Sequence, residues 1–526
     1  MSYREVYEKW CNDPYFDEAS REELKALEGN EAEIEDRFYR QLEFGTGGLR
    51  GVIGAGTNRM NIYTVRQATQ GLANYIISQN GQEKGVAIAH DSRRMSPEFA
   101  REAALCLNAN GIKTYLFESL RPTPELSFAV REFGCISGIV ITASHNPSHD
   151  NGYKVYFSDG AQAISPHAEG IVAEVNKVAW NQVKPFLEVD LGGVELVGKS
   201  AEDAYVKSIE NCVIDKQVMA VNKPKAVFTA VHGTGATLCP TVMRHFGLEP
   251  ALVEEQMIMD PRFPTVKQPN PEYAETLSMG IAKMRETGAD CLMATDPDAD
   301  RMGVAIRTRS GQIRLLTGNM IGSLLEYRAT QMKNKGIITK PENCTLIKTF
   351  VTTPLQDKIA ESHGLKCINT LTGFKWIGGR LTKYEEKLNS AMGEDCSGLS
   401  YLERAKLLQE HSTFFVFGGE ESYGYLGTDS VRDKDANAAV IMFCEMLAYL
   451  KSLDMTVDEY LDSIYLKCGY YLEDLKSIYR EGASGASEIQ AFLKILDEHP
   501  LSEVGGVKVA KSVNFAKDKI VDADGN

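Results

Sequence analysis

The sequence predicts an α/β protein made of three domains of related build. Its 526 residues are too many for a single hydrophobic core, because most domains hold about 100 to 200 residues. Short apolar runs alternate with helical stretches, which is typical of helices layered on a mainly parallel sheet. This alternation begins again twice along the chain, so we expect three α/β units.

The first unit follows a helical N-terminal segment and a glycine cluster. Residues 3–43 are rich in Glu, Lys, Leu and aromatic side chains, which favours helices, and residues 44–51 form the glycine cluster. In the rest of this unit, we expect strands at 86–89, 113–117 and 138–142 and helices at 97–110 and 124–133.

The same rhythm returns in the second and third units. In the second unit, the pattern predicts strands at 225–229 and 291–295 and a helix at 238–245. In the third unit, it predicts strands at 344–348 and 414–417 and a helix at 353–362. A further helix at 438–453 leads into the last segment. These positions divide the chain into the parts 1–200, 201–315, 316–455 and 456–526.

The composition indicates a globular protein that binds neither nucleic acid nor a membrane. The formal net charge is -15, whereas nucleic-acid-binding proteins more often present a basic face. No apolar run approaches the roughly 18 residues of a membrane span, and the N-terminus lacks a signal-peptide pattern. The 11 cysteines include no Cys-x-x-Cys pair, so we expect neither a zinc site nor a disulfide framework, and a cytoplasmic location.

A candidate nucleophile follows the last expected strand of the first unit. The segment Thr-Ala-Ser-His-Asn-Pro at 142–147 places Ser144 in a strand-end loop, where α/β sheets bind ligands. This serine could carry a phosphoryl group, with His145 and Asn146 supplying polar contacts. A plain turn closed by Pro147 explains the same residues equally well.

A candidate proton carrier, Lys154, lies ten residues further on, in Asn-Gly-Tyr-Lys-Val-Tyr. A lysine in a partly buried site can release its proton near neutral pH and transfer protons. On its own, however, an exposed lysine at the start of a strand is the favoured interpretation.

Three carboxylates follow a strand of the second unit. Asp296, Asp298 and Asp300 alternate along a tight loop and can converge on one hard cation. A calcium EF-hand loop needs Gly at its sixth position and Glu at its twelfth, where this chain has Arg301 and Arg307. Mg²⁺ with a phosphate oxygen is therefore the expected partner. Arg301 could hold a carboxylate or phosphate beside it.

Two loops of the third unit carry residues that could contact a sugar phosphate. Glu420 and Ser422 are two residues apart in Gly-Gly-Glu-Glu-Ser and can point the same way in an extended segment. A glycine-rich turn with solvated carboxylates remains an open alternative. Lys375 is expected in a glycine-bounded loop, where it could contact the substrate or simply stand beside a core tryptophan, Trp376. The charged run 432–435 is interpreted as the solvated start of a helix.

Together these motifs resemble the α-D-phosphohexomutase superfamily, in particular its phosphoglucomutase and phosphopentomutase branch. The resemblance runs from about Phe44 to beyond Arg432. Besides the serine and acidic loops, its motifs are the glycine cluster at 44–51, Arg-Pro-Thr-Pro at 121–124, Thr-Gly-Phe-Lys at 372–375 and Gly-Glu-Glu-Ser at 419–422. The resemblance implies three related α/β domains around a central cleft, plus a fourth domain.

The resemblance also implies a phosphoglucomutase that interconverts glucose 1-phosphate and glucose 6-phosphate. In the first domain, 1–200, Ser144 is the phosphoserine. Lys154, with Arg50 and His145 close by, serves the proton transfers and the transferring phosphoryl group. Glucose 1,6-bisphosphate is implied as intermediate and activator. The implied partners are small sugar phosphates, and we expect a monomer or a weak homodimer.

The resemblance assigns the metal and the sugar to the next two domains. In 201–315, the three aspartates of the acidic loop bind one Mg²⁺ per chain together with an oxygen on Ser144. In 316–455, substrate contacts come from Lys375, Glu420 and Ser422, and Arg301 joins them from the second domain.

The C-terminal part departs from the family pattern. The family's Arg-x-Ser-Gly-Thr-Glu-Pro loop, which anchors the second phosphate, is not found, and residues 480–488 resemble it only faintly. We therefore expect 456–526 to be an incomplete phosphate-binding domain. Residues 388–409 are extra sequence, either a lid or, as we favour, a surface insertion.

Three alternatives use the same motifs. A phosphopentomutase or a hexose-bisphosphate synthase would employ the same serine and metal with another substrate. A catalytically impaired sugar-phosphate binder would follow if the missing C-terminal loop were essential. Turnover of competing sugar phosphates would separate the enzymes, and tight binding without turnover would indicate the binder.

Overall fold

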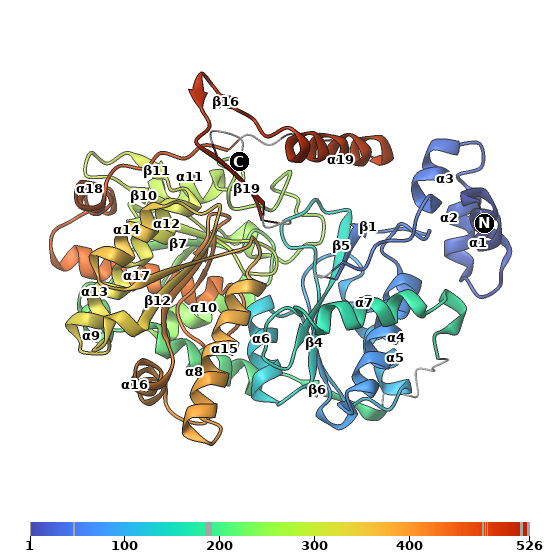
Figure 1. Ribbon diagram of the computed structural model, residues 1–526, viewed down its shortest axis with the longest axis horizontal. Helices are drawn as coiled ribbons and strands as arrows, with labels where there is room; N and C mark the ends of the chain where they lie inside the picture. Colours follow the sequence, from blue (N-terminus) through green and yellow to red (C-terminus); the bar gives the residue numbers. More distant parts are fainter. Residues whose placement is uncertain are drawn as a thin grey trace.

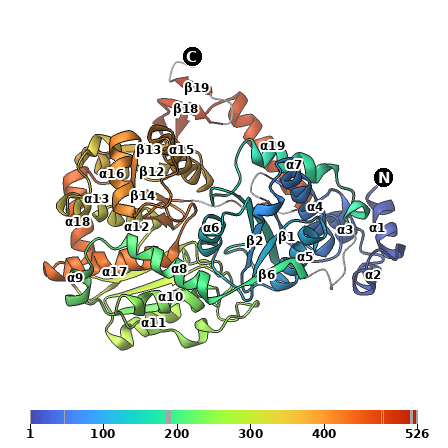
Figure 2. The ribbon, with the colours of Figure 1, turned by 90° about the horizontal axis from the view of Figure 1, so that it is seen from below.

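The computed structural model describes residues 2–45, 48–184, 192–475, 478, 480, 482–515 and 519–522. Within them the chain forms three α/β units, each built on its own sheet (Figure 1). The first unit lies on the right of this view and the third on the left. The view turned by 90° shows the second unit, in green, beside the third (Figure 2). The predicted α/β class with three related units is confirmed, whereas the exact domain boundaries stay predictions.

The first sheet has six strands in the described residues, in the order β1-β5-β4-β2-β3-β6. Its strands are β1 Leu49–Val52, β2 Val86–His90, β3 Thr114–Phe117, β4 Ser137–Ile141, β5 Asp150–Phe157 and β6 Val194–Val197. Strands β4, β2, β3 and β6 are parallel, but β5 and β1 run antiparallel to their neighbours. The sheet is therefore more mixed than the alternation predicted.

Helices cover both faces of this sheet. On one face lie α4 Ile62–Ser78, α5 Ser96–Ala109 and α7 His167–Lys177, and on the other α6 Thr123–Glu132 and α8 Lys199–Ile209. Strands β2 and β4 are buried along their whole length, as expected of parallel strands with helices on both sides.

The second and third sheets share one hydrophobic core. The second sheet has the order β11-β10-β9-β7-β8, with β7 Ala226–Thr229, β8 Ala251–Leu252, β9 Cys291–Thr295, β10 Met302–Arg307 and β11 Ile313–Leu315. The third has the order β13-β12-β14-β15, with β12 Cys344–Thr349, β13 Lys366–Thr370, β14 Phe414–Glu420 and β15 Gly424–Leu426. A single cluster of buried side chains runs through both, so these two units pack as one block.

One helix of this block, α17, lies in its interior. The second unit contributes α9 Lys216–Val221, α10 Gly235–His245 and α11 Ser278–Thr287. The third contributes α12 Gly318–Leu325, α13 Tyr327–Asn334, α14 Leu355–Ser362, α15 Lys375–Met392, α16 Tyr401–His411 and α17 Ala436–Ser452. Helix α17 is buried on nearly every side and contacts α9, α10 and β15. A helix that is apolar all round is expected in such an interior position.

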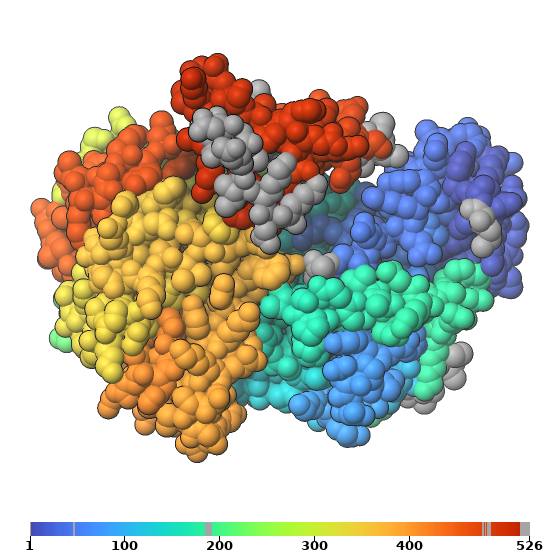
Figure 3. Space-filling model, viewed as in Figure 1, coloured from blue at the N-terminus to red at the C-terminus, as the bar shows by residue number. Residues whose placement is uncertain are grey.

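The chain begins and ends with peripheral elements. The predicted helical segment at 3–43 forms three helices, α1 Tyr3–Asn12, α2 Glu18–Lys25 and α3 Glu31–Phe38, which pack around Trp10 and Phe16. At the other end are α18 Val457–Cys468, α19 Gly482–Glu498 and the strands β16 Glu503–Val504, β17 Val507–Lys508, β18 Lys511–Asn514 and β19 Lys519–Asp522. Figure 3 shows this segment, in red, along the upper edge of the molecule.

One further prediction about local structure changes. The extra sequence at 388–409 is mostly helical, because α15 extends to Met392 and α16 begins at Tyr401. Leu388 and Leu408 join the shared core, so the segment belongs to the helical layer of the third unit.

None of the helices in the described part of the chain combines the length and apolar character that a membrane span requires.

Candidate active site

Ser144 lies in the loop between β4 and β5, which we call the serine loop (residues 142–149). Its side chain is 3% exposed, and its hydroxyl donates a 2.8 Å hydrogen bond to Asp296 Oδ2. Its backbone is left-handed, with φ +52°, a conformation that costs a non-glycine residue about 1–3 kcal/mol. The Thr142 hydroxyl oxygen helps to hold this conformation by accepting the Ser144 N–H at 2.8 Å.

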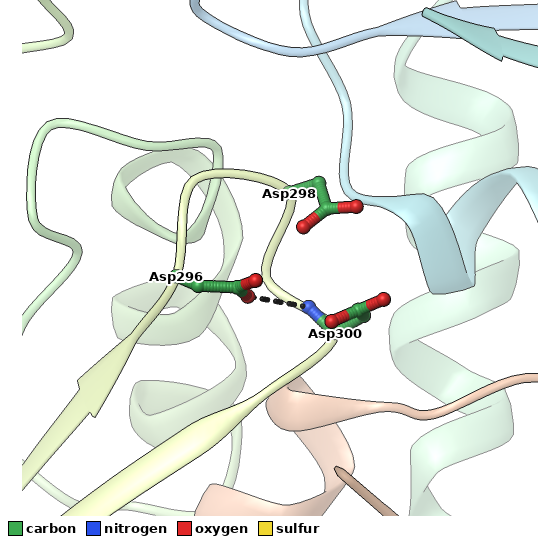
Figure 4. Close-up of side chains that lie close together, drawn as sticks. All are labelled: Asp296, Asp298 and Asp300. Atoms are coloured by element: carbon green, nitrogen blue, oxygen red, sulfur yellow. Dashed lines mark hydrogen bonds between the residues drawn. The ribbon is translucent and has the colours of Figure 1, made fainter. Parts of the chain in front are cut away.

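The acidic loop, residues 296–301, joins β9 to β10. Its three aspartate side chains lie close together in one tight loop (Figure 4). Asp296 Oδ1 accepts the backbone N–H groups of Asp300 and Arg301, each at 3.1 Å. Ala299 has φ +51°, which closes the turn. Asp296, Asp298 and Asp300 are all buried, at 1% exposure or less.

The acidic loop fits a divalent cation. One ligand oxygen from each aspartate lies within 4.8 Å of the others. Asp298 Oδ1 and Asp300 Oδ1 are buried without a hydrogen-bond partner among the described residues, and unpaired buried carboxylate oxygens are costly. Burial and the two neighbouring carboxylates raise the pKa of Asp296 well above its usual range. Mg²⁺, which prefers oxygen ligands, would satisfy these oxygens and relieve the repulsion.

Lys154 reaches the acidic loop from the middle of β5. Its Nζ lies 2.9 Å from Asp298 Oδ2 and 3.8 Å from Asp300 Oδ2. Burial alone would raise the pKa of Asp298, but the Lys154 ammonium group holds that pKa below its usual range. Lys154 is only 6% exposed, so the exposed position that its sequence context favours is wrong.

A second lysine, Lys434, approaches from the third unit. Its Nζ lies 3.1 Å from both Asp300 Oδ2 and Asp433 Oδ1. The expectation that residues 432–435 form a solvated helix start is wrong, because all four charged side chains are buried. Although burial would lower the pKa of Lys434, Asp300 and Asp433 raise it. The signal in the sequence is the helix α17 that follows, because its first nine residues are apolar except for Asn437 and all of them are buried.

Thr123 is another contact that sequence reasoning missed. It begins α6 in the first unit, and its N–H donates to the Asp298 backbone carbonyl at 2.9 Å. Its hydroxyl donates to Asp298 Oδ2, also at 2.9 Å. The Arg-Pro-Thr-Pro motif, noted only as part of a resemblance, thus joins the first unit to the acidic loop.

His145 and Arg50 border the serine. The His145 Nδ1 atom lies 3.2 Å from Ser144 Oγ. Burial, together with the Arg301 and Arg50 guanidinium groups, lowers the pKa of His145 to about 2, so its ring is neutral near pH 7. Arg50 is exposed on β1 and donates to Asn146 Oδ1 at 3.3 Å.

The glycine cluster before Arg50 is described only in part, because Thr46 and Gly47 lie outside the described residues. Gly48 has φ +107°, and a Cβ there would lie 1.8 Å from the backbone oxygen of Tyr153. Only glycine allows this close approach of the cluster to β5.

In the C-terminal segment 480–488, residue 481 and several side chains likewise lie outside the described residues.

The third unit brings Glu420 to the acidic loop. Glu420 ends β14, and its Oε1 accepts the Gly373 N–H at 3.0 Å. Burial raises the pKa of Glu420. The adjacent turn pairs with the start of β10, because the Met302 N–H donates to the Tyr423 carbonyl at 2.9 Å. Ser422 lies in this turn, so the expected extended segment through Glu420 and Ser422 is wrong.

Lys375 and Arg301 are the two remaining residues predicted to contact the substrate. Lys375 begins α15 and does not lie in the expected loop, and burial lowers its pKa. Its Nζ lies 5.6 Å from the centroid of the Trp376 ring. Arg301 pairs with Glu272 at 3.2 Å, which agrees with the expectation that it holds a nearby carboxylate. Side chains from all three units therefore meet around Asp296, Asp298 and Asp300.

Comparison with known families matches the three units one by one. Residues 41–182, 203–311 and 317–467 match the α/β/α domains I, II and III described for phosphoglucomutase/phosphomannomutase. The human phosphopentomutase is 35% identical over 461 residues, covering 85% of this chain and 71% of that protein. The phosphoglucomutase of Staphylococcus haemolyticus is 33% identical over 483 residues, covering 90% and 81%.

Solved structures show the same fold. A putative phosphomannomutase from Thermus thermophilus superposes with a TM-score of 0.63 at 23% identity, covering 84% of this chain and 89% of that one. The phosphoglucomutase pp63/parafusin from Paramecium, in its open form, gives a TM-score of 0.61 at 19% identity, with 93% and 86% covered.

Proposed function

The chain belongs to the phosphoglucomutase/phosphomannomutase family, and from this premise we propose that it interconverts glucose 1-phosphate and glucose 6-phosphate through a phosphorylated Ser144. As a family member it is a phosphomutase, an isomerase-class enzyme that moves a phosphoryl group within its substrate. The proposal concerns which sugar it uses and which residues carry the reaction.

The contact between Ser144 and Asp296 is the observation that carries the proposal. A serine held in a left-handed conformation, with its hydroxyl 2.8 Å from a carboxylate, is a strained and oriented nucleophile. Ser144, Asp296, Asp298 and Asp300 would hold one Mg²⁺, which when bound neutralises the charge of the transferring phosphoryl group.

The transfer step uses basic side chains on both sides of the serine. The free sugar hydroxyl attacks the phosphorus of phospho-Ser144, the bond between phosphorus and Oγ breaks, and Oγ ends as the hydroxyl after proton transfer. We assign this proton transfer to Lys154, whose ammonium group would also add positive charge. His145 and Arg50 border the same oxygen and the loop beside it.

The product of the first transfer is glucose 1,6-bisphosphate. It turns over within the site, and its other phosphate returns to Ser144, which completes the isomerisation. The same compound, added from outside, would phosphorylate a bare Ser144 and so act as activator. We assign the sugar hydroxyls to Glu420 and Ser422, and orientation of the substrate to Lys375 and Arg301.

A second candidate is phosphopentomutase activity. The observation that supports it is the 35% identity to the human phosphopentomutase. The identities to the phosphoglucomutases, 33% and 32%, are close to this value. Both activities need the same nucleophile and cation, and they differ in the size of the sugar that the third unit must accept. The impaired binder rests on the Arg-x-Ser-Gly-Thr-Glu-Pro motif that the sequence lacks, and no observation favours a hexose-bisphosphate synthase.

Turnover measured on three sugar phosphates decides between these candidates. Initial rates with glucose 1-phosphate, ribose 1-phosphate and mannose 1-phosphate, each primed with glucose 1,6-bisphosphate, should give the highest kcat/KM for glucose 1-phosphate. A higher kcat/KM for ribose 1-phosphate would transfer the assignment to phosphopentomutase. Binding without turnover of any of the three would exclude both.

The proposal also covers the cellular compartment and the oligomeric state of the enzyme. All 11 cysteines are free thiols in the structure, which agrees with a reducing cytoplasm. We propose a monomer or weak homodimer acting on small sugar phosphates.

A further inference from the structure

A buried arginine lies directly beneath the serine loop. Arg93, between β2 and α5, is 1% exposed. Its guanidinium group donates to four backbone carbonyl oxygens, those of Ser144 at 2.6 Å, Asn146 at 2.5 Å, Pro147 at 2.8 Å and Asp150 at 3.1 Å. One side chain therefore binds the backbone along most of the serine loop and at the first residue of β5.

Asp91 completes this support from the end of β2. Its Oδ2 accepts the Thr142 hydroxyl at 2.7 Å and lies 3.3 Å from Arg93 Nε. Because Thr142 in turn accepts the Ser144 N–H, both backbone groups of Ser144 are tied to one buried ion pair. The N–H is held through Thr142 and Asp91, and the carbonyl is held by Arg93. These contacts hold the left-handed backbone of Ser144 on both sides.

Arg93 also contacts the second unit. Its guanidinium carbon lies 5.1 Å from the ring centroid of Phe263, a residue that is 1% exposed and has φ +50°. Phe263 belongs to the segment between β8 and β9, in the same unit that supplies Asp296. The arginine therefore lies between the loop that carries the nucleophile and the unit that carries the metal ligands.

We propose that Arg93 is a positioning residue for phosphoryl transfer, which sets the backbone conformation of Ser144 and its alignment with Asp296 without touching the substrate. This inference rests on the proposed function of Ser144. Arginine is needed because its planar fork presents five donors in fixed directions, whereas a lysine ammonium is a compact group with three. A lysine at this position keeps the charge but cannot reach all four carbonyl groups.

The test compares Arg93→Lys with Arg328→Lys. Arg328 is an equally buried arginine on α13 that donates to the carbonyl groups of Cys212 and Gly427, away from the serine loop. We expect Arg93→Lys to lower kcat about tenfold to a hundredfold, as small misplacements of reacting groups do, with KM within about twofold because the sugar contacts are unchanged. The control should lower the melting temperature but leave kcat unchanged.

Amide hydrogen exchange gives a readout that does not depend on activity. The peptide spanning residues 143–150 should exchange faster in Arg93→Lys than in the wild type and in Arg328→Lys. If Arg93→Lys is unstable, Arg93→Ala offers a second test. Free guanidinium ion should restore part of the kcat of this variant and part of the amide protection of its 143–150 peptide. Urea at the same concentration should restore neither.

The possible outcomes separate the two proposals. Unchanged kcat or unchanged exchange of the 143–150 peptide in Arg93→Lys would overturn the positioning role. Failure of the wild-type Ser144 to accept phosphate from glucose 1,6-bisphosphate would instead overturn the proposed function, and the exchange measurement would still decide whether Arg93 holds the loop.

Discussion

Lys434 Nζ lies 3.1 Å from Asp300 Oδ2, so a lysine just before α17 neutralises a carboxylate of the second unit. Both side chains are almost fully buried. A buried charge that loses a close counter-charge is strongly destabilised, and the other cations near Asp300, Lys154 and Arg301, lie further away, at 3.8 and 3.7 Å. The charge balance of the acidic loop therefore depends on a residue from the third unit as well as on Lys154.

Replacing this lysine should destabilise the protein. We expect Lys434→Met to lower the free energy of unfolding in the presence of a chelator by about 3–5 kcal/mol, and to lower kcat at least about tenfold. Urea denaturation and initial rates measure the two effects. The matched control is Lys451→Met, which removes a half-exposed ion pair with Asp290 and should cost about 0–1 kcal/mol. Equal losses of the free energy of unfolding in the two variants would contradict the role of Lys434 as a counter-charge to Asp300.

Removal of the serine hydroxyl should abolish phosphorylation. After incubation with glucose 1,6-bisphosphate, intact mass should show one added phosphate on the wild type and none on Ser144→Ala. Turnover should fall at least about a thousandfold, as expected when a covalent nucleophile is lost. Ser148→Ala, in the same loop, is the control and should keep both properties. A phosphorylated and active Ser144→Ala variant would refute the role of this serine.

Mg²⁺ should both activate and stabilise the enzyme through the acidic loop. A ligand at 100 times its dissociation constant stabilises the folded state by about 2.7 kcal/mol, so the melting temperature should rise with added Mg²⁺ and activity should vanish with a chelator. Asp298→Asn should lose most of the Mg²⁺-dependent shift. Asp454→Asn, at an exposed carboxylate, should keep it. An Mg²⁺ response that survives in Asp298→Asn would place the metal elsewhere.

The main features of the site could be predicted from the sequence because they follow apolar strands. Strands β4 and β9 are buried along their whole length, and such runs are easily recognised. The polar loops after them, with Ser144 and the three aspartates, therefore fall at the carboxyl ends of sheet strands, where α/β proteins place ligands. Sequence pattern alone is sufficient for this part of the architecture.

Lys154 is named as a site residue through the family resemblance, but the burial of the cationic side chains could not be predicted from local sequence, because it depends on tertiary contacts. Lys154, Lys434 and Arg93 each resemble surface residues in their local sequence, and long charged side chains usually are exposed. Here they are buried by carboxylates and carbonyl groups distant in the chain, such as Asp298 for Lys154 and Asp300 for Lys434. The antiparallel direction of β5, which places Lys154 beside the acidic loop, likewise follows from sheet pairing.

Glu445 on α17 gives the stability a pH dependence of its own. Burial raises the pKa of this carboxyl to about 7, although Arg328 and the backbone N–H groups of Ile214 and Asp215 act in the opposite direction. Since the pKa in the unfolded chain is about 4.3, the folded protein binds the proton more tightly. The resulting stability is fully present below about pH 4, and is lost as the pH rises through about 7.

Glu445→Gln should remove that dependence. The amide oxygen can still accept the two N–H groups that Glu445 Oε1 accepts now, while no proton is gained or lost. The free energy of unfolding of the wild type relative to Glu445→Gln should therefore fall by about 2–3 kcal/mol between pH 5 and pH 8. Urea denaturation across this range measures the difference, with Glu394→Gln, at an exposed residue, as the control. A difference that stays constant with pH would show that Glu445 is ionised in the folded protein throughout, and that Arg328 and the two N–H groups outweigh its burial.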